Sequence, residues 1–213
     1  MSELTREDEE FQMLLDVADE FSKQKSGYTT RKKSGNATEI VIRNNLLKRR
    51  FNVTLKPDVK IQGSNTKNDM LLLKPNEPNE LEQYAPVKVD MVLEIKNNAT
   101  PAQRNKKSVQ PSEVIRDKFD KLERDTGVNR FAVVVLSEKL LSETPYKYAI
   151  TEKKIRKENC KVFTLVARRE YPRYPKYSRG GLYTKEVILK MLENHELWKT
   201  EEWEKLIAYL KAV

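Results

Sequence analysis

The sequence predicts a mixed α/β fold, in which helices precede, interrupt and follow the strands of one sheet. Val87–Lys96 is an apolar strand that ends on a glutamate and a lysine. Phe131–Leu136 is an uninterrupted apolar run of the kind found in a central strand covered on both faces. Between them, Pro111–Arg124 repeats apolar residues at helical spacing and stops at Gly127. We therefore expect the core order α-β-β-β-α-β, followed by C-terminal helices.

The other expected elements share one kind of evidence, a hydrophobic period of helix or strand bounded by turn residues. In chain order they are an amphipathic helix over Thr5–Lys23, a basic loop to Gly35, a helix over Ala37–Arg50, a strand over Val53–Ile61 interrupted near Pro57, a strand over Met70–Leu73, an exposed loop over Pro75–Pro86, a strand over Val162–Ala167 and helices over Thr184–Glu193 and Thr200–Lys211. We divide the chain into residues 1–35, a core over 36–167 and a basic, tyrosine-rich loop with helices over 168–213, together forming one continuous domain.

Composition excludes several classes of protein. The 213 residues carry a formal net charge of +9, which favours a polyanionic partner such as nucleic acid. One cysteine and one histidine exclude an internal disulfide, a zinc finger and a nuclease site with two histidines. Cys160 leads into an apolar strand, so we interpret it as a core residue and not as half of a hydrolase pair with His195. We expect a cytoplasmic protein with no membrane segment.

The strongest functional signal is the end of the Val87–Lys96 strand. Alternate residues of a strand share a face, so Val89, Met91, Leu93 and Ile95 point one way, and Asp90, Val92, Glu94 and Lys96 point the other. Asp69 directly precedes the Met70–Leu73 strand, and a hairpin between the two strands places it next to Glu94. Two carboxylates beside a lysine suit metal-assisted phosphodiester hydrolysis.

This pattern resembles the PD-(D/E)XK nuclease superfamily, which includes many type II restriction endonucleases. Asp69, then Glu94 and Lys96 at the end of the next strand, carry the resemblance, which covers roughly residues 36–136. It implies a restriction-endonuclease-like core and a Mg²⁺ ion, with Mn²⁺ as the alternative, bound by Asp69, Glu94 and the main-chain carbonyl of Ile95. It also implies that Lys96 orients water or neutralises charge on the phosphate, and that Glu39 faces the site from the preceding helix.

Each of these residues also has a plainer interpretation. Glu94 and Lys96 could form a surface ion pair on an edge strand, and Glu39 could close a capping box with Asn36. Asp58, which follows a proline, competes with Asp69 as the metal ligand, and Asp90 is a weaker third choice. A second Glu-x-Lys sequence, Glu152 to Lys154, lacks an apolar strand before it, and we expect a solvated turn there.

Basic residues near the expected site indicate where nucleic acid could bind. One group follows the Glu94 strand, and a second alternates with tyrosines that could pack on sugars or bases. The candidates are Arg104, Lys106, Lys107, Arg168, Arg169, Arg173, Lys176 and Arg179. The alternative for the second group is an ordinary loop whose tyrosines cover the sheet.

The sequence thus favours a Mg²⁺-dependent endonuclease acting on double-stranded DNA, of the type II restriction kind. The resemblance implies a homodimer, because cutting two strands needs two sites. Two alternatives remain open: a structure-selective nuclease of repair or recombination, and a non-catalytic nucleic-acid-binding protein with the same fold. RNA also remains open as the substrate.

Overall fold

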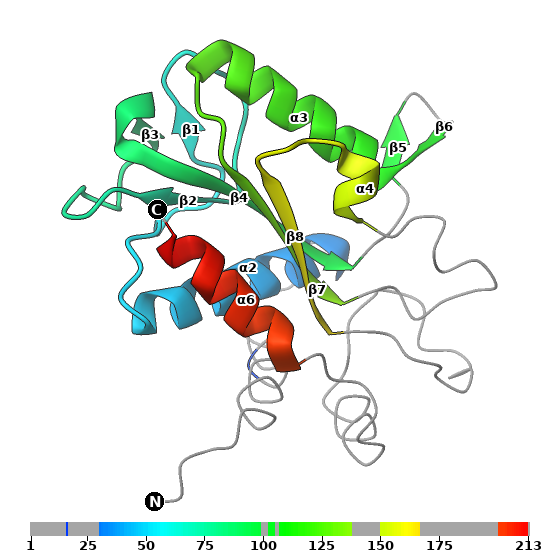
Figure 1. The fold of residues 1–213 in the computed structure, drawn as a ribbon, viewed down its shortest axis with the longest axis horizontal. Coiled ribbons are helices and arrows are strands. Elements are labelled where there is room, and N and C mark those ends of the chain that lie inside the picture. Colours follow the sequence, from blue (N-terminus) through cyan, green and yellow to red (C-terminus); the bar gives the residue numbers. More distant parts are fainter. Residues whose placement is uncertain are drawn as a thin grey trace, which may run out of the picture.

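The protein is built around a four-stranded mixed sheet (Figure 1). The computed structural model describes residue 16 and residues 30–98, 102–104, 107–137, 150–166 and 200–212. The strand order is β2-β4-β7-β8, with β2 at Met70–Leu73, β4 at Val89–Asn98, β7 at Phe131–Ser137 and β8 at Cys160–Val166. Strand β2 is antiparallel to β4, whereas β4, β7 and β8 run parallel. The mixed α/β fold class and the central position of the Phe131 strand are confirmed.

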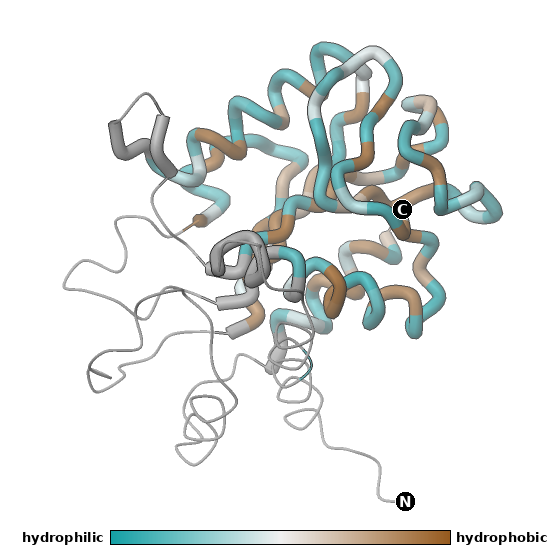
Figure 2. The backbone as a smooth tube through the Cα atoms, turned by 180° about the vertical axis from the view of Figure 1, so that it is seen from behind, coloured by the Kyte–Doolittle hydropathy of each residue, from teal (hydrophilic) through white to brown (hydrophobic). Residues whose placement is uncertain are grey.

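Helices cover both faces of this sheet. Helices α2 (Thr30–Lys48) and α6 (Thr200–Lys211) lie on one face, and α3 (Pro111–Thr126) with the short α4 (Glu152–Ile155) lies on the other (Figure 1). Figure 2 shows hydrophobic and hydrophilic positions alternating along α3, as expected for a helix with one buried face.

Each face of the sheet has its own hydrophobic core. The core under α2 and α6 includes Val41, Ile42, Leu46, Met91, Leu93, Ile95, Trp203, Leu206, Ile207 and Leu210. The core under α3 includes Leu71, Val92, Ile115, Phe119, Leu122, Phe131, Val133 and Cys160. Ile115, Phe119 and Leu122 thus form the buried stripe of the helix expected over Pro111–Arg124, and the burial predicted for Cys160 is confirmed. Helix α3 ends at Gly127, whose φ of 74° lies in the left-handed region where glycine is favoured.

Short elements complete the described fold. Strand β1 (Lys60–Ile61) pairs parallel with β3 (Gln83–Tyr84), and a 3-10 turn at Pro86–Lys88 leads into β4. Strands β5 (Ala102–Arg104) and β6 (Lys107–Val109) form a separate antiparallel pair. The helices expected over Thr5–Lys23 and Thr184–Glu193 lie outside the described residues, apart from Asp16 in a helical position.

The prediction of a continuous strand over Val53–Ile61 is wrong. Only isolated bridges at Val53 and Val59 and the two residues of β1 are extended. Asp58 has a φ of 58°, and this left-handed residue directly after Pro57 breaks the strand. The loop expected over residues 75–86 also contains β3, whose Tyr84 is buried and not exposed.

Helix α2 begins earlier than predicted. It starts at Thr30, within the segment expected to be a basic loop, and ends at Lys48. Glu39 therefore lies well inside the helix, and the capping box with Asn36 is wrong. Once Val41, Ile42 and Leu46 fix the helix in the core, each added residue at its beginning gains a hydrogen bond without a new nucleation cost.

Two further corrections concern strand geometry. The pairing of β2 with β4 shifts between Leu72 and Leu73, so that Leu73 pairs with Val89 instead of Asp90. This irregularity turns Val89 toward the α3 core, whereas the alternation of Met91, Leu93 and Ile95 toward the other core is confirmed. The Glu152 segment forms the single-turn helix α4 and not a plain turn, although Glu152 and Lys153 are exposed as expected.

Candidate active site

The pairing of β2 with β4 places Asp69 beside the second half of β4. Met70, the first residue of β2, is opposite Leu93, so Asp69 lies just beyond the paired region. Its Oδ2 atom accepts a hydrogen bond from the main-chain N–H of Ile95, with an N···O distance of 2.8 Å. The Asp69 carboxylate thus satisfies a strand N–H where the neighbouring strand has ended, which fixes the position of the carboxylate.

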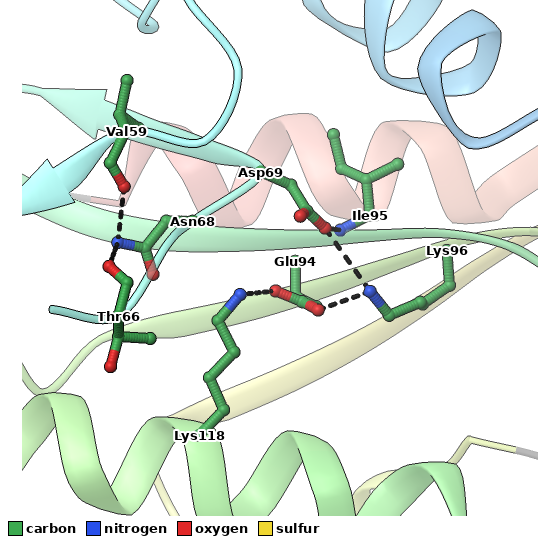
Figure 3. A network of polar contacts seen from close by, with 8 residues as sticks. All are labelled: Val59, Thr66, Asn68, Asp69, Glu94, Ile95, Lys96 and Lys118. Atoms are coloured by element: carbon green, nitrogen blue, oxygen red, sulfur yellow. Dashed lines mark hydrogen bonds and ion pairs between the residues drawn. The ribbon is translucent and has the colours of Figure 1, made fainter. Parts of the chain in front are cut away.

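Glu94 is held by two lysines from different elements. Its side chain is 7% exposed and points toward α3. Oε1 accepts a hydrogen bond from Nζ of Lys96 on the same strand, and Oε2 accepts one from Nζ of Lys118 on α3 (Figure 3). Nζ of Lys96 also lies 3.5 Å from Oδ2 of Asp69. The structure therefore brings Asp69, Glu94 and Lys96 together, as predicted, and adds Lys118.

The lysines keep Glu94 ionised. Burial by itself raises the pKa of this carboxyl, but the ammonium groups of Lys96 and Lys118 outweigh burial and hold the pKa below its usual value. Burial likewise works against the charge on Lys96, and the carboxylates of Glu94 and Asp69 outweigh it and raise the pKa of the lysine. At neutral pH this part of the site holds a carboxylate and an ammonium in contact.

Asp69 shifts in the opposite direction from Glu94. Burial and the negative charge of Glu94 raise the pKa of Asp69, while Lys96 and Lys118 act against that rise. Two neighbouring carboxylates repel each other when both are charged, so a bound cation makes it easier for both to ionise. Carboxylate pairs with separated pKa values are therefore common in sites that bind cations or transfer protons.

Glu39 on α2 is electrostatically coupled to the same carboxylates. Burial, followed by the charge of Asp69, raises the pKa of Glu39 from 4.5 to about 7, while Arg43 and Lys96 lower it. The position expected for Glu39, facing the site from the helix before the sheet, agrees with this coupling.

Arg43 is a buried cation that ties α2 to the residues around β2. Its Nε donates to the carbonyl of Thr54 at 2.8 Å, and its Nη2 donates to the carbonyl of Asp69 at 3.3 Å. Burial lowers the pKa of Arg43, while Glu39 and Asp69 act to raise it. Arg43 thus holds the main chain of the same residue whose carboxylate reaches Ile95.

Sequence reasoning missed both Arg43 and Lys118, although each left a signal. Arg43 directly follows the buried Ile42, and Lys118 lies between the inward-facing Ile115 and Phe119. A cation within an apolar helix stripe needs a partner in the interior. Pairing such cations with the carboxylates on the next strand would have pointed to both residues.

The oxygen atoms present are of the kind that Mg²⁺ or Mn²⁺ binds. Within the described part of the chain, no three acidic, histidine or cysteine side chains are gathered as a ready metal site. Both described contacts of the Asp69 carboxylate use Oδ2, whereas both oxygens of Glu94 contact ammonium groups. The donor set of Asp69, Glu94 and the Ile95 carbonyl therefore fits a divalent cation on condition that an ammonium leaves Glu94.

The alternative carboxylates do not reach this cluster. Asp58 is exposed and pairs with Lys67 at 3.1 Å. Asp90 lies at the irregular pairing near the beginning of β4. The structure thus favours Asp69 over both as the neighbour of Glu94.

The basic candidates are only partly described. Arg104 on β5 and Lys107 on β6 are register partners in the antiparallel pair that follows β4. Lys106 lies outside the described residues. So does the whole second group, which consists of Arg168, Arg169, Arg173, Lys176 and Arg179.

Comparisons with known proteins identify the fold but no family. No protein-family model matches the chain, and no curated protein matches it in sequence. Among solved structures, the chain is similar to NucC from P. aeruginosa ATCC27853 in its cAAA-bound form, with a TM-score of 0.50 and 12% sequence identity, over 99% of this chain and 92% of that one. None of the described helices is long and apolar enough to cross a membrane. The chain thus has a mixed α/β, restriction-endonuclease-like fold, with its clustered carboxylates and lysines where β2 meets β4.

Proposed function

We propose that this protein is a metal-dependent nuclease that hydrolyses DNA phosphodiester bonds. One observation carries the proposal: Asp69, directly before β2, and Glu94, on the paired strand β4, meet the same Lys96 ammonium. The similarity to the fold of NucC and the net charge of +9 support it independently of that geometry.

We assign each residue a role that its position in the cluster supports. Asp69 and Glu94, with the carbonyl of Ile95, would hold Mg²⁺ or Mn²⁺, which supplies a polarised phosphate and a more acidic water when bound. Lys96 is placed to orient the attacking water or to neutralise charge that develops on the phosphate. Glu39, with its pKa near neutrality, is placed to accept a proton from water or to complete the cation site.

The finer proposal is an endonuclease of the type II restriction kind that cuts double-stranded DNA as a homodimer. Arg104 and Lys107, on the strand pair after β4, would contact phosphates, together with the basic residues of the 168–179 segment. A structure-selective nuclease is the alternative within the same chemistry, and a non-catalytic binding protein is the alternative outside it.

The test is incubation of the protein with long unmethylated duplex DNA, in Mg²⁺ or in EDTA. Wild type is compared with Glu94→Gln, which removes the charge and keeps the shape, and with the matched control Glu158→Gln at an exposed position. We expect cleavage that requires both Mg²⁺ and Glu94 and is unchanged in the control. Lys96→Ala should lower the cleavage rate by about 10²–10³-fold and affect DNA binding far less.

The products distinguish the alternatives. Discrete fragments would support a sequence-specific endonuclease, and a smear with the same dependence would support a structure-selective or nonspecific nuclease. Cleavage of RNA but not DNA would change the substrate and keep the chemistry. Duplex binding that is the same in wild type and Glu94→Gln, with no Mg²⁺-dependent cleavage of any substrate, would favour the binding protein.

A further inference from the structure

Lys118 is the part of the cluster that the proposed chemistry leaves without a role. It comes from α3, whereas Lys96, which pairs with the other oxygen of Glu94, is on β4 itself. Its side chain is 18% exposed and reaches from the helix to Oε2 of Glu94 (Figure 3). Because Lys96 contacts the other oxygen, Glu94 has an ammonium on each side.

The four groups Asp69, Glu94, Lys96 and Lys118 together carry no net negative charge even before a cation is added. The ammonium groups of Lys96 and Lys118 balance the carboxylate of Glu94 and, when it is ionised, that of Asp69. A divalent cation held by the carboxylates leaves a surplus of positive charge in a partly buried site, which is unfavourable. A phosphodiester of the nucleic acid brings a negative charge that reduces the surplus, so cation and phosphate favour each other's binding.

Lys118 can leave Glu94 without loosening the helix that carries it. Helix α3 is held by the buried side chains of Ile115, Phe119 and Leu122, and the Phe119 ring stacks on Phe131 with 4.3 Å between centroids. Lys157 also pairs with two acids of α3, Asp120 and Glu123. A four-carbon stem lets the ammonium move while the helix stays in place.

We propose that Lys118 is a positioning residue that exchanges partners, holding Glu94 until it passes to a phosphate of the nucleic acid as a divalent cation takes its place. The inference rests on the proposed nuclease function and deepens it. Lys118 makes the site bind the cation weakly by itself and more tightly with nucleic acid. The coupling is reciprocal, so the cation strengthens nucleic-acid binding by the same factor.

The test is calorimetric titration of Mn²⁺ into the full chain, with and without a short phosphorothioate duplex that keeps the phosphate charges. The variants are Lys118→Met, which keeps the apolar stem, and Lys118→Gln, which is neutral but still donates a hydrogen bond to Glu94. Lys121→Met is the matched control, since Lys121 is exposed on the same helix. Thermal unfolding identifies any variant that fails to fold.

In the absence of duplex, we expect both Lys118 variants to bind Mn²⁺ at least roughly tenfold more tightly than wild type, because one repelling charge is gone. The added gain from the duplex should shrink by a similar factor. Lys121→Met should match wild type in both respects.

Two results overturn the inference in distinguishable ways. If the Lys118 variants keep the wild-type affinity and the wild-type gain from the duplex, or bind Mn²⁺ more weakly, Lys118 is a structural ion pair and the proposed function still stands. If wild type binds Mn²⁺ neither alone nor with the duplex, the proposed function fails and the Lys118 inference fails with it.

Discussion

Glu39→Gln should change how stability depends on pH, in a direction fixed by the structure. Burial and Asp69 raise the pKa of Glu39 from 4.5 to about 7 in the folded protein. The folded state therefore keeps a proton that the unfolded chain releases, so stability falls as pH rises from 4.5 toward 7 and then levels off. The whole window corresponds to about 3 kcal/mol, or about 2 kcal/mol after allowance for the solvent that reaches this half-buried side chain.

Urea unfolding between pH 5 and 8.5, in EDTA so that stray divalent cations do not act on the carboxylates, measures the effect. We expect wild type to lose about 2 kcal/mol more across this range than Glu39→Gln, which has no proton to release. The variant should therefore be the more stable protein at pH 8.5. Glu158→Gln, at an exposed position, should follow wild type. Parallel curves for wild type and Glu39→Gln would refute the burial and the coupling to Asp69.

The remaining predictions concern the scaffold. Gly63 has a φ of +93°, and a Cβ there would lie 2.8 Å from the Asp125 carbonyl oxygen, so Gly63→Ala should lower the free energy of unfolding by more than about 2 kcal/mol. Gly127→Ala, at a φ of +74° in open space, should cost about 1–2 kcal/mol, and urea unfolding that ranks the two variants in the opposite order would contradict the argument. Cys160 is buried, and burial with the nearby Glu152 carboxylate raises the pKa of its thiol to about 12, so iodoacetamide at pH 8 should label it only after unfolding. Rapid labelling of the native protein would show that the β8 edge of the core is open.

The sequence predicts the centre of the site well because strand alternation is a local property. Glu94 and Lys96 are two residues apart on one strand, so their shared face follows from strand geometry alone. Asp69 could be added because the apolar strands β2 and β4 are separated only by residues 74–88, most of which the sequence predicts to be a loop, and strands that follow one another in the chain commonly pair.

The remaining features depend on tertiary contacts. Lys118 is on α3, 24 residues after Glu94 in the chain. The ion pair between them depends on which turn of α3 packs over β4. Helix α2 begins early because its later residues are fixed in the core and allow the helix to extend toward its beginning. Val89 faces the α3 core because the pairing of β2 with β4 shifts, and a simple alternation of residues does not predict such a shift. Pro57 indicated that the strand over Val53–Ile61 would be interrupted. How much of the strand is lost depends on the left-handed conformation of Asp58, which the sequence did not reveal.

The polar cluster is better explained by chemistry than by stability. Removing charges from water is costly, and apolar residues in place of a buried ion pair are often neutral or stabilising by about 1–4 kcal/mol. Glu94 follows Val92 and Leu93 of the two hydrophobic cores along β4, yet it is kept charged by two lysines, one of them on a helix that the core already holds in place. This arrangement keeps Glu94 ionised between two ammonium groups, and the Lys118 proposal has a divalent cation and a phosphate take over those contacts. Under the proposed nuclease function, such an exchange would let a divalent cation and a phosphate enter the site without leaving Glu94 unpaired, and an ion pair that served stability alone would have no need of it.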